Sequence, residues 1–168
     1  SLVLGGGGAR GAAHIGVMRA LREAGIEVDH IGGTSMGAIV GSAAAADLPL
    51  QDLPGLIDRW RSSGALRDVT IPTVSLLHAR KTEAFLTDVL GQGGIEDLWR
   101  NFLCTSVDLT DGRLAVHESG TAAQWVRASG CVPGVFPPVV GPDGHLHIDG
   151  GMLNNVPADL MRARWNGR

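Results

Sequence analysis

The first 46 residues repeat one pattern twice, and this repetition limits the fold more than any other feature of the chain. A short apolar run over residues 1–4 is followed by the turn GGGGARG and by apolar residues at helical spacing over 12–24. A second apolar run, over 26–33, leads through a turn around Ser35 into a helix of small residues over 36–46. Two consecutive strand–turn–helix units predict the α/β class, with a mainly parallel sheet packed against helices.

The rest of the chain extends this pattern without an internal repeat or a linker. Periodicity predicts helices over 52–64, 82–90, 122–129 and 157–165, and strands over 102–110, 114–119 and 145–149. The Gly/Pro-rich segment GCVPGVFPPVVGPDG predicts an irregular loop. A length of 168 residues suits one domain. Because the chain starts directly at a strand and stops where a helix ends, we expect this single domain, residues 1–168, to come from a longer protein.

The composition limits the classes of binding partner and the cellular compartments that suit the protein. The formal net charge of −3 argues against nucleic acid as a partner. Two cysteines are too few for a disulfide framework in a chain of this size, which favours a reducing compartment such as the cytoplasm. No apolar run approaches the ~18 residues of a membrane-spanning helix, and no signal peptide precedes the first strand.

The first candidate site is the glycine run after the first strand. Gly6, Gly8 and Gly11 satisfy the spacing G-x-G-x-x-G of a dinucleotide-binding turn, and Glu27 and Asp29 follow at about the distance of a ribose-binding acid. That acid should end the second strand, whereas the predicted strand runs past Asp29. The same loop can instead present backbone N–H groups to a developing anion at a helix N-terminus. A nucleotide-binding domain using Gly6–Gly11 is therefore the main alternative to catalysis.

The second candidate site is the serine between two glycines. Gly33, Ser35 and Gly37 form the pattern G-x-S-x-G, with a predicted strand before it and a predicted helix after it. In a nucleophile elbow the serine occupies a sharp strand-to-helix turn where side chains at the glycine positions would clash. The context therefore favours Ser35 as a nucleophile and Gly33 and Gly37 as clearance around it.

A serine nucleophile needs a proton acceptor, and Asp149 is the third candidate. It ends the last predicted strand, immediately before two glycines, in the segment HIDGGMLNN. No histidine follows Asp149, so a triad in the order Ser35–Asp149–His is impossible. Asp149 could accept the proton directly if burial raised the pKa of its carboxyl. A triad that pairs Asp108 or Asp111 with His117, His145 or His147 stays open, although His145 and His147 alternate along a strand and are expected to face solvent.

Taken together, these segments resemble the patatin-like phospholipase family. GGGGARG, GGTSMGA and DGG occur in the order and approximate spacing of that family. The stretches IEDLWRNFLCTSVDLT, VRASGCVPGVFPPV and GHLHIDGGMLNNVPADLMR are similar to its neuropathy target esterase branch and the bacterial relatives of that branch. The resemblance covers nearly the whole chain and is weakest between residues 61 and 94.

The resemblance implies a three-layer α/β/α fold and a catalytic dyad in which Ser35 is the nucleophile and Asp149 the base. It also implies a metal-independent hydrolase without a cofactor, acting on carboxylic esters of phospholipids or lysophospholipids. The same resemblance implies that the backbone of Gly6, Gly7 and Gly8 stabilises the oxyanion. Arg10 corresponds to the basic residue that follows these glycines in the family.

Two further expectations concern contact with a membrane and the absence of catalysis. A lipid substrate implies peripheral contact with a membrane, in part through segments of the parent protein outside this chain. Candidate contact residues here, which a buried core would explain equally well, are Leu76, Leu77, Val135 and Phe136. A third hypothesis is a binding module that keeps these motifs without catalysing a reaction.

Overall fold

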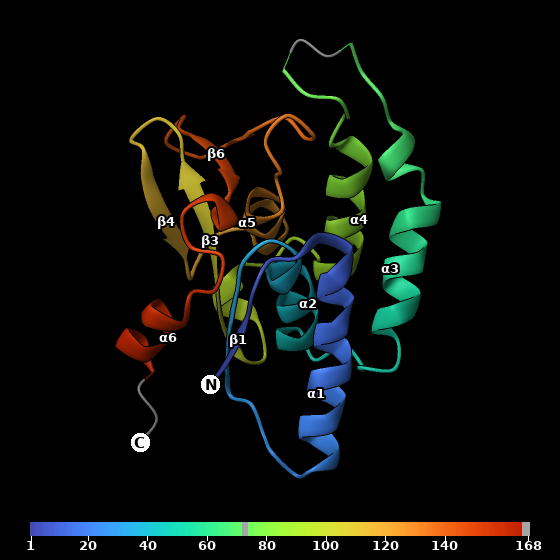
Figure 1. Ribbon diagram of the computed structural model, residues 1–168, viewed down its shortest axis with the longest axis vertical. Coiled ribbons are helices and arrows are strands. Elements are labelled where there is room, and N and C mark those ends of the chain that lie inside the picture. Colours follow the sequence, from blue (N-terminus) through green and yellow to red (C-terminus); the bar gives the residue numbers. More distant parts are fainter. Residues whose placement is uncertain (72–73, 166–168) are drawn as a thin grey trace.

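The sheet lies at the centre of the molecule, with helices on both of its faces (Figure 1). The computed structural model describes residues 1–71 and 74–165. Within this part of the chain the strands are β1 (Leu2–Leu4), β2 (His30–Gly33), β3 (Asn101–Asp108), β4 (Arg113–His117), β5 (Val139–Val140) and β6 (Leu146–Asp149). The α-helices are α1 (Ala13–Glu23), α2 (Met36–Ala45), α3 (Leu53–Ser62), α4 (Arg80–Leu90), α5 (Ala122–Ser129) and α6 (Ala158–Arg164).

The strand order is β1-β2-β3-β6-β5, and β4 pairs with the other edge of β3. β1, β2 and β3 are parallel to one another, whereas β4 and β6 are antiparallel to β3. β5 is antiparallel to β6 and therefore runs in the same direction as β1, β2 and β3. Four of the six strands share one direction, which agrees with the mainly parallel sheet that the strand–turn–helix units predict.

The side-chain positions of β2 alternate between the two faces of the sheet, and their contacts show which helix covers each face. A Cβ atom built on Gly41 of α2 would lie 3.0 Å from Cγ2 of Ile31, so Ile31 faces α2. A Cβ on the next residue, Gly32, would instead overlap Met161 of α6. Neighbouring residues of a strand point to opposite faces. The sheet therefore separates α2 from α6, which lie on opposite sides of it in Figure 1.

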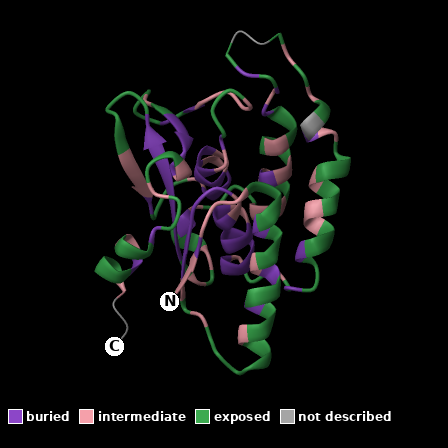
Figure 2. Cartoon of the chain, in the orientation of Figure 1, coloured by how far each residue is buried: buried purple, intermediate pink, exposed green. Residues whose placement is uncertain are grey.

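Helix α2 is the central helix of the core. Its sequence MGAIVGSAAA is almost entirely buried, whereas α1, α3 and α4 expose one side to solvent (Figure 2). Small side chains let the backbone of α2 approach the sheet, and a Cβ on Gly37 would overlap the carbonyl group of Leu4. This close packing fixes the start of α2, which directly follows Ser35, against the ends of β1 and β2.

Two elements differ from the sequence-based expectation. β2 begins at His30, whereas the apolar run predicts a strand from residue 26. The neighbouring strand explains the difference, because β1 begins at Leu2, which pairs with Ile31, and so offers no partner to residues 26–29 on that side. The irregular loop over 130–144 contains the short strand β5, which two valines are too few to predict.

Candidate active site

Strands β2 and β6 approach each other end to end along one edge of β3. Gly33, the last residue of β2, pairs with Cys104, and Asp149, the last residue of β6, pairs with Ser106. β4 occupies the opposite edge of β3 over the same region. Two residues of a strand span ~7 Å, so the carboxyl ends of β2 and β6 meet in one place. The topology thus brings Ser35, two residues beyond β2, to the end of β6.

Ser35 occupies a sharp turn between β2 and α2. Its φ of 56° and ψ of −124° lie in a region that residues other than glycine rarely adopt, at a cost of ~1–3 kcal/mol. A Cβ on Gly33 would lie 2.5 Å from the carbonyl oxygen of Gly37, and Gly37 itself packs on the backbone of Leu4. Both glycines are therefore required by the turn, which has the geometry that the pattern G-x-S-x-G predicts.

The hydroxyl of Ser35 donates a hydrogen bond to Asp149. The distance from Oγ to Oδ2 is 2.6 Å, and the other carboxylate oxygen, Oδ1, accepts from the backbone N–H of Gly151 at 2.8 Å. Ser35 is 9 % exposed and Asp149 is 6 % exposed. Burial raises the pKa of the Asp149 carboxyl, although the bonds from Ser35 and Gly151 act in the opposite direction. A raised pKa makes this carboxylate a stronger proton acceptor than an ordinary aspartate.

The glycine loop after β1 lies beside Ser35. A Cβ on Gly6 would lie 3.0 Å from Cβ of Ser35. The backbone N–H of Gly6 donates to the carbonyl of Asn155 at 3.1 Å, and the side-chain amide of Asn155 donates back to the carbonyl of Gly6 at 3.3 Å. Within the described residues, the amides of Gly7 and Gly8 donate to no other protein group. Of the three glycines named as anion donors, these two have the uncommitted N–H groups.

Arg10 belongs to the short 3-10 helix Gly8–Ala12 that follows this loop. Its backbone N–H donates to the carbonyl of Gly7 at 3.2 Å, which closes the turn through the main chain. The side chain is exposed and forms no hydrogen bond or ion pair within the part of the chain that the structure describes. The guanidinium is therefore available to an anionic group outside the protein.

Several supporting residues give no signal in the sequence, because their partners are distant along the chain. Ser129 Oγ accepts the backbone N–H of Ser35 at 2.9 Å. Thr34 Oγ1 bonds with Thr105 Oγ1 at 2.7 Å and donates to the carbonyl of Asn154 at 3.1 Å. These bonds, with those of Asn155, tie the serine turn to β3, to α5 and to the segment that follows Asp149.

The histidines of the open triad alternative bind other groups. Ser106 Oγ lies 2.7 Å from Nε2 of His117 and 2.9 Å from Nδ1 of His147. His145 Nδ1 lies 2.9 Å from Oδ2 of Asp108. Among the described residues, no histidine ring forms a hydrogen bond with Ser35. The expectation that His147 faces solvent is wrong, because it is 4 % exposed and packs edge-on against Trp125.

The acids of the nucleotide-binding alternative lie at the wrong end of the sheet. Asp29 directly precedes β2, and Glu27 lies two residues earlier. The glycine loop follows the carboxyl end of β1, which pairs in parallel with β2 from Leu2–Ile31 to Leu4–Gly33. A four-residue strand therefore separates both acids from the loop, by ~13 Å along the strand. This geometry does not suit a loop and an acid that share one nucleotide.

One acidic cluster lies away from Ser35. Among the described residues, Asp108, Asp111 and His145 form the one group of three or more His, Cys, Asp or Glu side chains whose ligand atoms all lie within 4.8 Å of one another. Arg113 pairs with both carboxylates, at 3.0 Å to Asp111 and 3.5 Å to Asp108. Arg113 already supplies positive charge to these carboxylates, so they do not depend on a metal ion for neutralisation.

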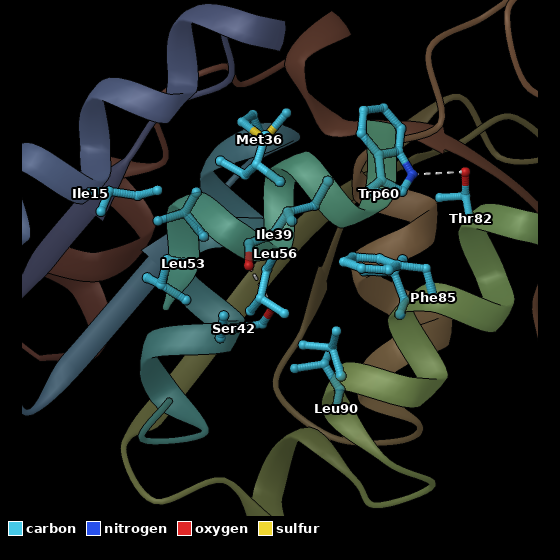
Figure 3. A pocket seen from close by; sticks show the side chains of 15 residues that line it. Ile15, Met36, Ile39, Ser42, Leu53, Leu56, Trp60, Thr82, Phe85 and Leu90 are labelled. Atoms are coloured by element: carbon cyan, nitrogen blue, oxygen red, sulfur yellow. Dashed lines mark hydrogen bonds between the residues drawn. The ribbon is translucent and has the colours of Figure 1, made fainter. Parts of the chain in front are cut away.

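An apolar cavity opens next to the serine turn (Figure 3). Met36, the residue after Ser35, lines it together with Ile39 of the same helix. The other walls come from α1, α3 and α4, and include Ile15, Leu53, Leu56, Trp60, Phe85 and Leu90. Trp60 Nε1 donates to the hydroxyl of Thr82 at 3.2 Å, which joins α3 to α4 across the cavity. The lining suits a hydrocarbon chain rather than a polar ligand.

Comparison with known proteins identifies the class. The family model of patatin-like phospholipase matches residues 2–162. The chain therefore belongs to this family. As in the sequence-based resemblance, the similar proteins include the neuropathy target esterase branch.

Three relatives show how far the similarity extends. The chain is 43 % identical over 170 residues to patatin-like phospholipase domain-containing protein ZK370.4 of Caenorhabditis elegans, covering 96 % of this chain. It is 40 % identical over 166 residues to neuropathy target esterase sws of Drosophila melanogaster, covering 95 % of the chain. It is 39 % identical over 169 residues to human patatin-like phospholipase domain-containing protein 6, covering 97 % of the chain. In each case the chain spans 12 % of the relative's own length.

A solved structure confirms the fold. The structure of VipD from Legionella pneumophila aligns with a TM-score of 0.63 over 91 % of this chain and 45 % of the VipD chain, at 18 % identity. At this identity the likeness concerns the fold alone. Across residues 1–71 and 74–165, the structure contains no helix with both the length and the apolar character needed to cross a bilayer.

Proposed function

We propose that the chain is a serine acyl hydrolase that cleaves carboxylic esters of phospholipids or lysophospholipids with a Ser35–Asp149 dyad. The observation that carries the proposal is the hydrogen bond of 2.6 Å from Ser35 Oγ to a buried carboxylate whose pKa is raised by burial. Family membership supports the reaction class, and the hydrogen bonds of His117, His147 and His145 to Ser106 and Asp108, with none to Ser35 among the described residues, favour a dyad over a triad.

In the first step, Ser35 Oγ attacks the ester carbonyl carbon while its proton moves to Oδ2 of Asp149. The tetrahedral oxyanion accepts hydrogen bonds from the uncommitted amides of Gly7 and Gly8. The loss of one such donor typically lowers a rate by roughly 10²–10³. Collapse of the intermediate breaks the ester C–O bond, and the proton on Asp149 passes to the departing alcohol. The product of this step is an acyl-enzyme.

In the second step, water attacks the acyl-enzyme while Asp149 accepts a proton from it. Collapse then expels Ser35 Oγ, which recovers that proton, and a fatty acid is released. No step in this sequence requires a metal ion or a cofactor, so the proposed reaction is metal-independent.

The proposed substrate positions follow from the surroundings of Ser35. The acyl chain would enter the apolar cavity that begins at Met36, and the exposed guanidinium of Arg10 would bind the phosphate of the head group. A lysophospholipid has one acyl chain, which would occupy this apolar cavity.

Peripheral membrane contact is part of the proposal. Exposed apolar side chains flank the glycine loop, because Val156 packs against Gly5 while remaining 54 % exposed, and Met152 and Leu153 are exposed just before it. Leu76 is exposed as well. Leu77 is buried, and Val135 and Phe136 are half-buried, so these three are less suited to this role. A cytoplasmic location, with membrane association assisted by other parts of the parent protein, is consistent with two buried, unpaired cysteines.

Labelling with a fluorophosphonate tests the proposal. We expect one label per chain on Ser35 in the wild type and little or no label in Ser35→Ala or Asp149→Asn. Release of fatty acid from lysophospholipid should follow the same order. If Asp149→Asn labelled as fast as the wild type, the dyad would be wrong and a histidine triad would return. If the wild type neither labelled nor hydrolysed any ester, a silent binding module would be the better account.

A further inference from the structure

One short segment contacts both members of the proposed dyad. Ser129, the last residue of α5, accepts the backbone N–H of Ser35 on its Oγ at 2.9 Å. Two residues later, the carbonyl of Cys131 accepts the backbone N–H of Asp149 at 2.9 Å. The end of α5 therefore holds the main chain of Ser35 and of Asp149 at once, although these residues lie 114 positions apart.

The contact to Ser35 is made where its backbone most needs a partner. Ser35 is buried, has a positive φ, and lies beyond the last paired residue of β2. Its N–H is therefore outside the strand ladder and before the first hydrogen bonds of α2. A buried N–H without an acceptor is unfavourable, so the acceptor contributes directly to holding this turn.

Ser129 has no other evident task. Its side chain is fully buried, with 0 % exposure. Within the described residues, the bond to Ser35 is the one hydrogen bond of its hydroxyl. A serine at the end of a helix packed against the core could be replaced by alanine on grounds of volume alone, so the hydroxyl is explained by its acceptor role.

We propose that Ser129 is a positioning residue that fixes the backbone of Ser35, and with it the alignment of the nucleophile toward Asp149. This inference rests on the proposed function. Loss of the acceptor lets the Ser35 peptide rotate toward another partner, and Oγ moves with it. A displacement of about 1 Å at a reacting group can lower a rate by ~10².

The test compares rates of fluorophosphonate labelling in the wild type, Ser129→Ala and Ser75→Ala. Ser75 is a matched control because it is also buried, at 6 % exposure, lies outside the dyad and the lining of the apolar cavity, and donates its hydroxyl to the carbonyl of Leu77 at 3.0 Å. We expect Ser129→Ala to label ~10–100-fold more slowly, and Ser75→Ala to label within ~3-fold of the wild type. In ester hydrolysis, kcat should fall in Ser129→Ala while KM stays nearly unchanged, because substrate contacts are intact.

A second pair of variants keeps the test valid if Ser129→Ala does not fold. Ser129→Thr retains the hydroxyl acceptor. Ser129→Val introduces a side chain of nearly the same shape as threonine but without a hydroxyl. We expect Thr to restore labelling to within ~3-fold of the wild type and Val to remain ~10–100-fold slower. Equal rates for Thr and Val, or a Ser129→Ala rate equal to that of Ser75→Ala, would overturn the positioning role. Those results would leave the proposed function intact, whereas a wild type that does not label at Ser35 would remove both.

Discussion

Two aspartates on the same face of the sheet have opposite chemistry. Asp149 pairs in register with Ser106, and Asp108 lies two residues further along β3, so the two carboxylates share a face. Both are buried, at 6 % and 1 % exposure. Asp149 accepts hydrogen bonds from neutral groups, the hydroxyl of Ser35 and the N–H of Gly151. Asp108 accepts from the ring of His145 and pairs with the guanidinium of Arg113.

The two aspartates differ in pKa because their hydrogen-bond partners differ in charge. The hydrogen bond from His145 is the largest influence on Asp108 and lowers its pKa to about 2, while two backbone N–H groups at Oδ1 act in the same direction. Among the residues that the structure describes, Asp149 has no cationic partner, so burial dominates and its pKa is raised. Burial is therefore compatible with either a permanent anion or a proton acceptor. Only the aspartate without a cation nearby is suited to accept the proton of a serine.

The largest effect should come from replacing the two carboxylates in turn. Asp149→Asn removes the base, and we expect kcat/KM for ester hydrolysis to fall by ~10³–10⁴. Asp108→Asn is the matched control on the same face, and its activity should stay within ~3-fold of the wild type once only folded protein is counted. Steady-state hydrolysis of a lysophospholipid by both variants measures the difference. Comparable losses in the two variants would mean that Asp149 has no special role.

The pH dependence of activity should report the ionisation of the Asp149 carboxyl. The base must be ionised to accept a proton, so activity is lost as the pH falls through its folded-state pKa. Because burial raises that pKa, we expect the acid limb of kcat/KM to lie above the ordinary aspartate value of about 4. The limb should be unchanged in Asp108→Asn. A profile that is flat down to pH 4 would contradict a base with a raised pKa.

Local patterns made the serine turn predictable, and long-range contacts made its support unpredictable. Gly33 and Gly37 lie within two residues of Ser35, and their role depends on a turn that the sequence itself signals. Asp149 is a candidate from the sequence because it ends the last predicted strand before two glycines, and because the absence of a histidine after it excludes the triad order Ser35–Asp149–His. The pairing register of β3 brings β2 and β6 together, and this register cannot be predicted from the sequence of either strand. The same holds for Ser129 and Asn155, which act through single contacts to distant residues.

Replacement of Asp108 should lower stability, although it should leave activity nearly unchanged. A carboxyl with a lowered folded-state pKa adds stability above its unfolded pKa of about 4, and loses this contribution as the pH falls toward 2. We therefore expect Asp108→Asn to lower the unfolding temperature by several degrees at pH 7 and by about half as much at pH 3. Thermal unfolding followed by circular dichroism measures both. An equal loss at the two pH values would show that shape, and not charge, explains the effect.

The smallest effect concerns the ring that distinguishes Asp108 from Asp149. The hydrogen bond to Asp108 raises the pKa of His145. A histidine with a raised folded-state pKa adds stability that is fully present below its unfolded value of about 6.5 and is lost as the pH rises through the folded value. His145→Gln should therefore lower the unfolding temperature by a few degrees at pH 5.5 and hardly at all at pH 9. Once the pH exceeds the folded pKa, the wild-type ring is neutral, and Arg113 keeps a positive charge beside Asp108. A loss that persists at pH 9 would mean that the ring acts by packing, and the difference between the two aspartates would then depend on Arg113 and the backbone.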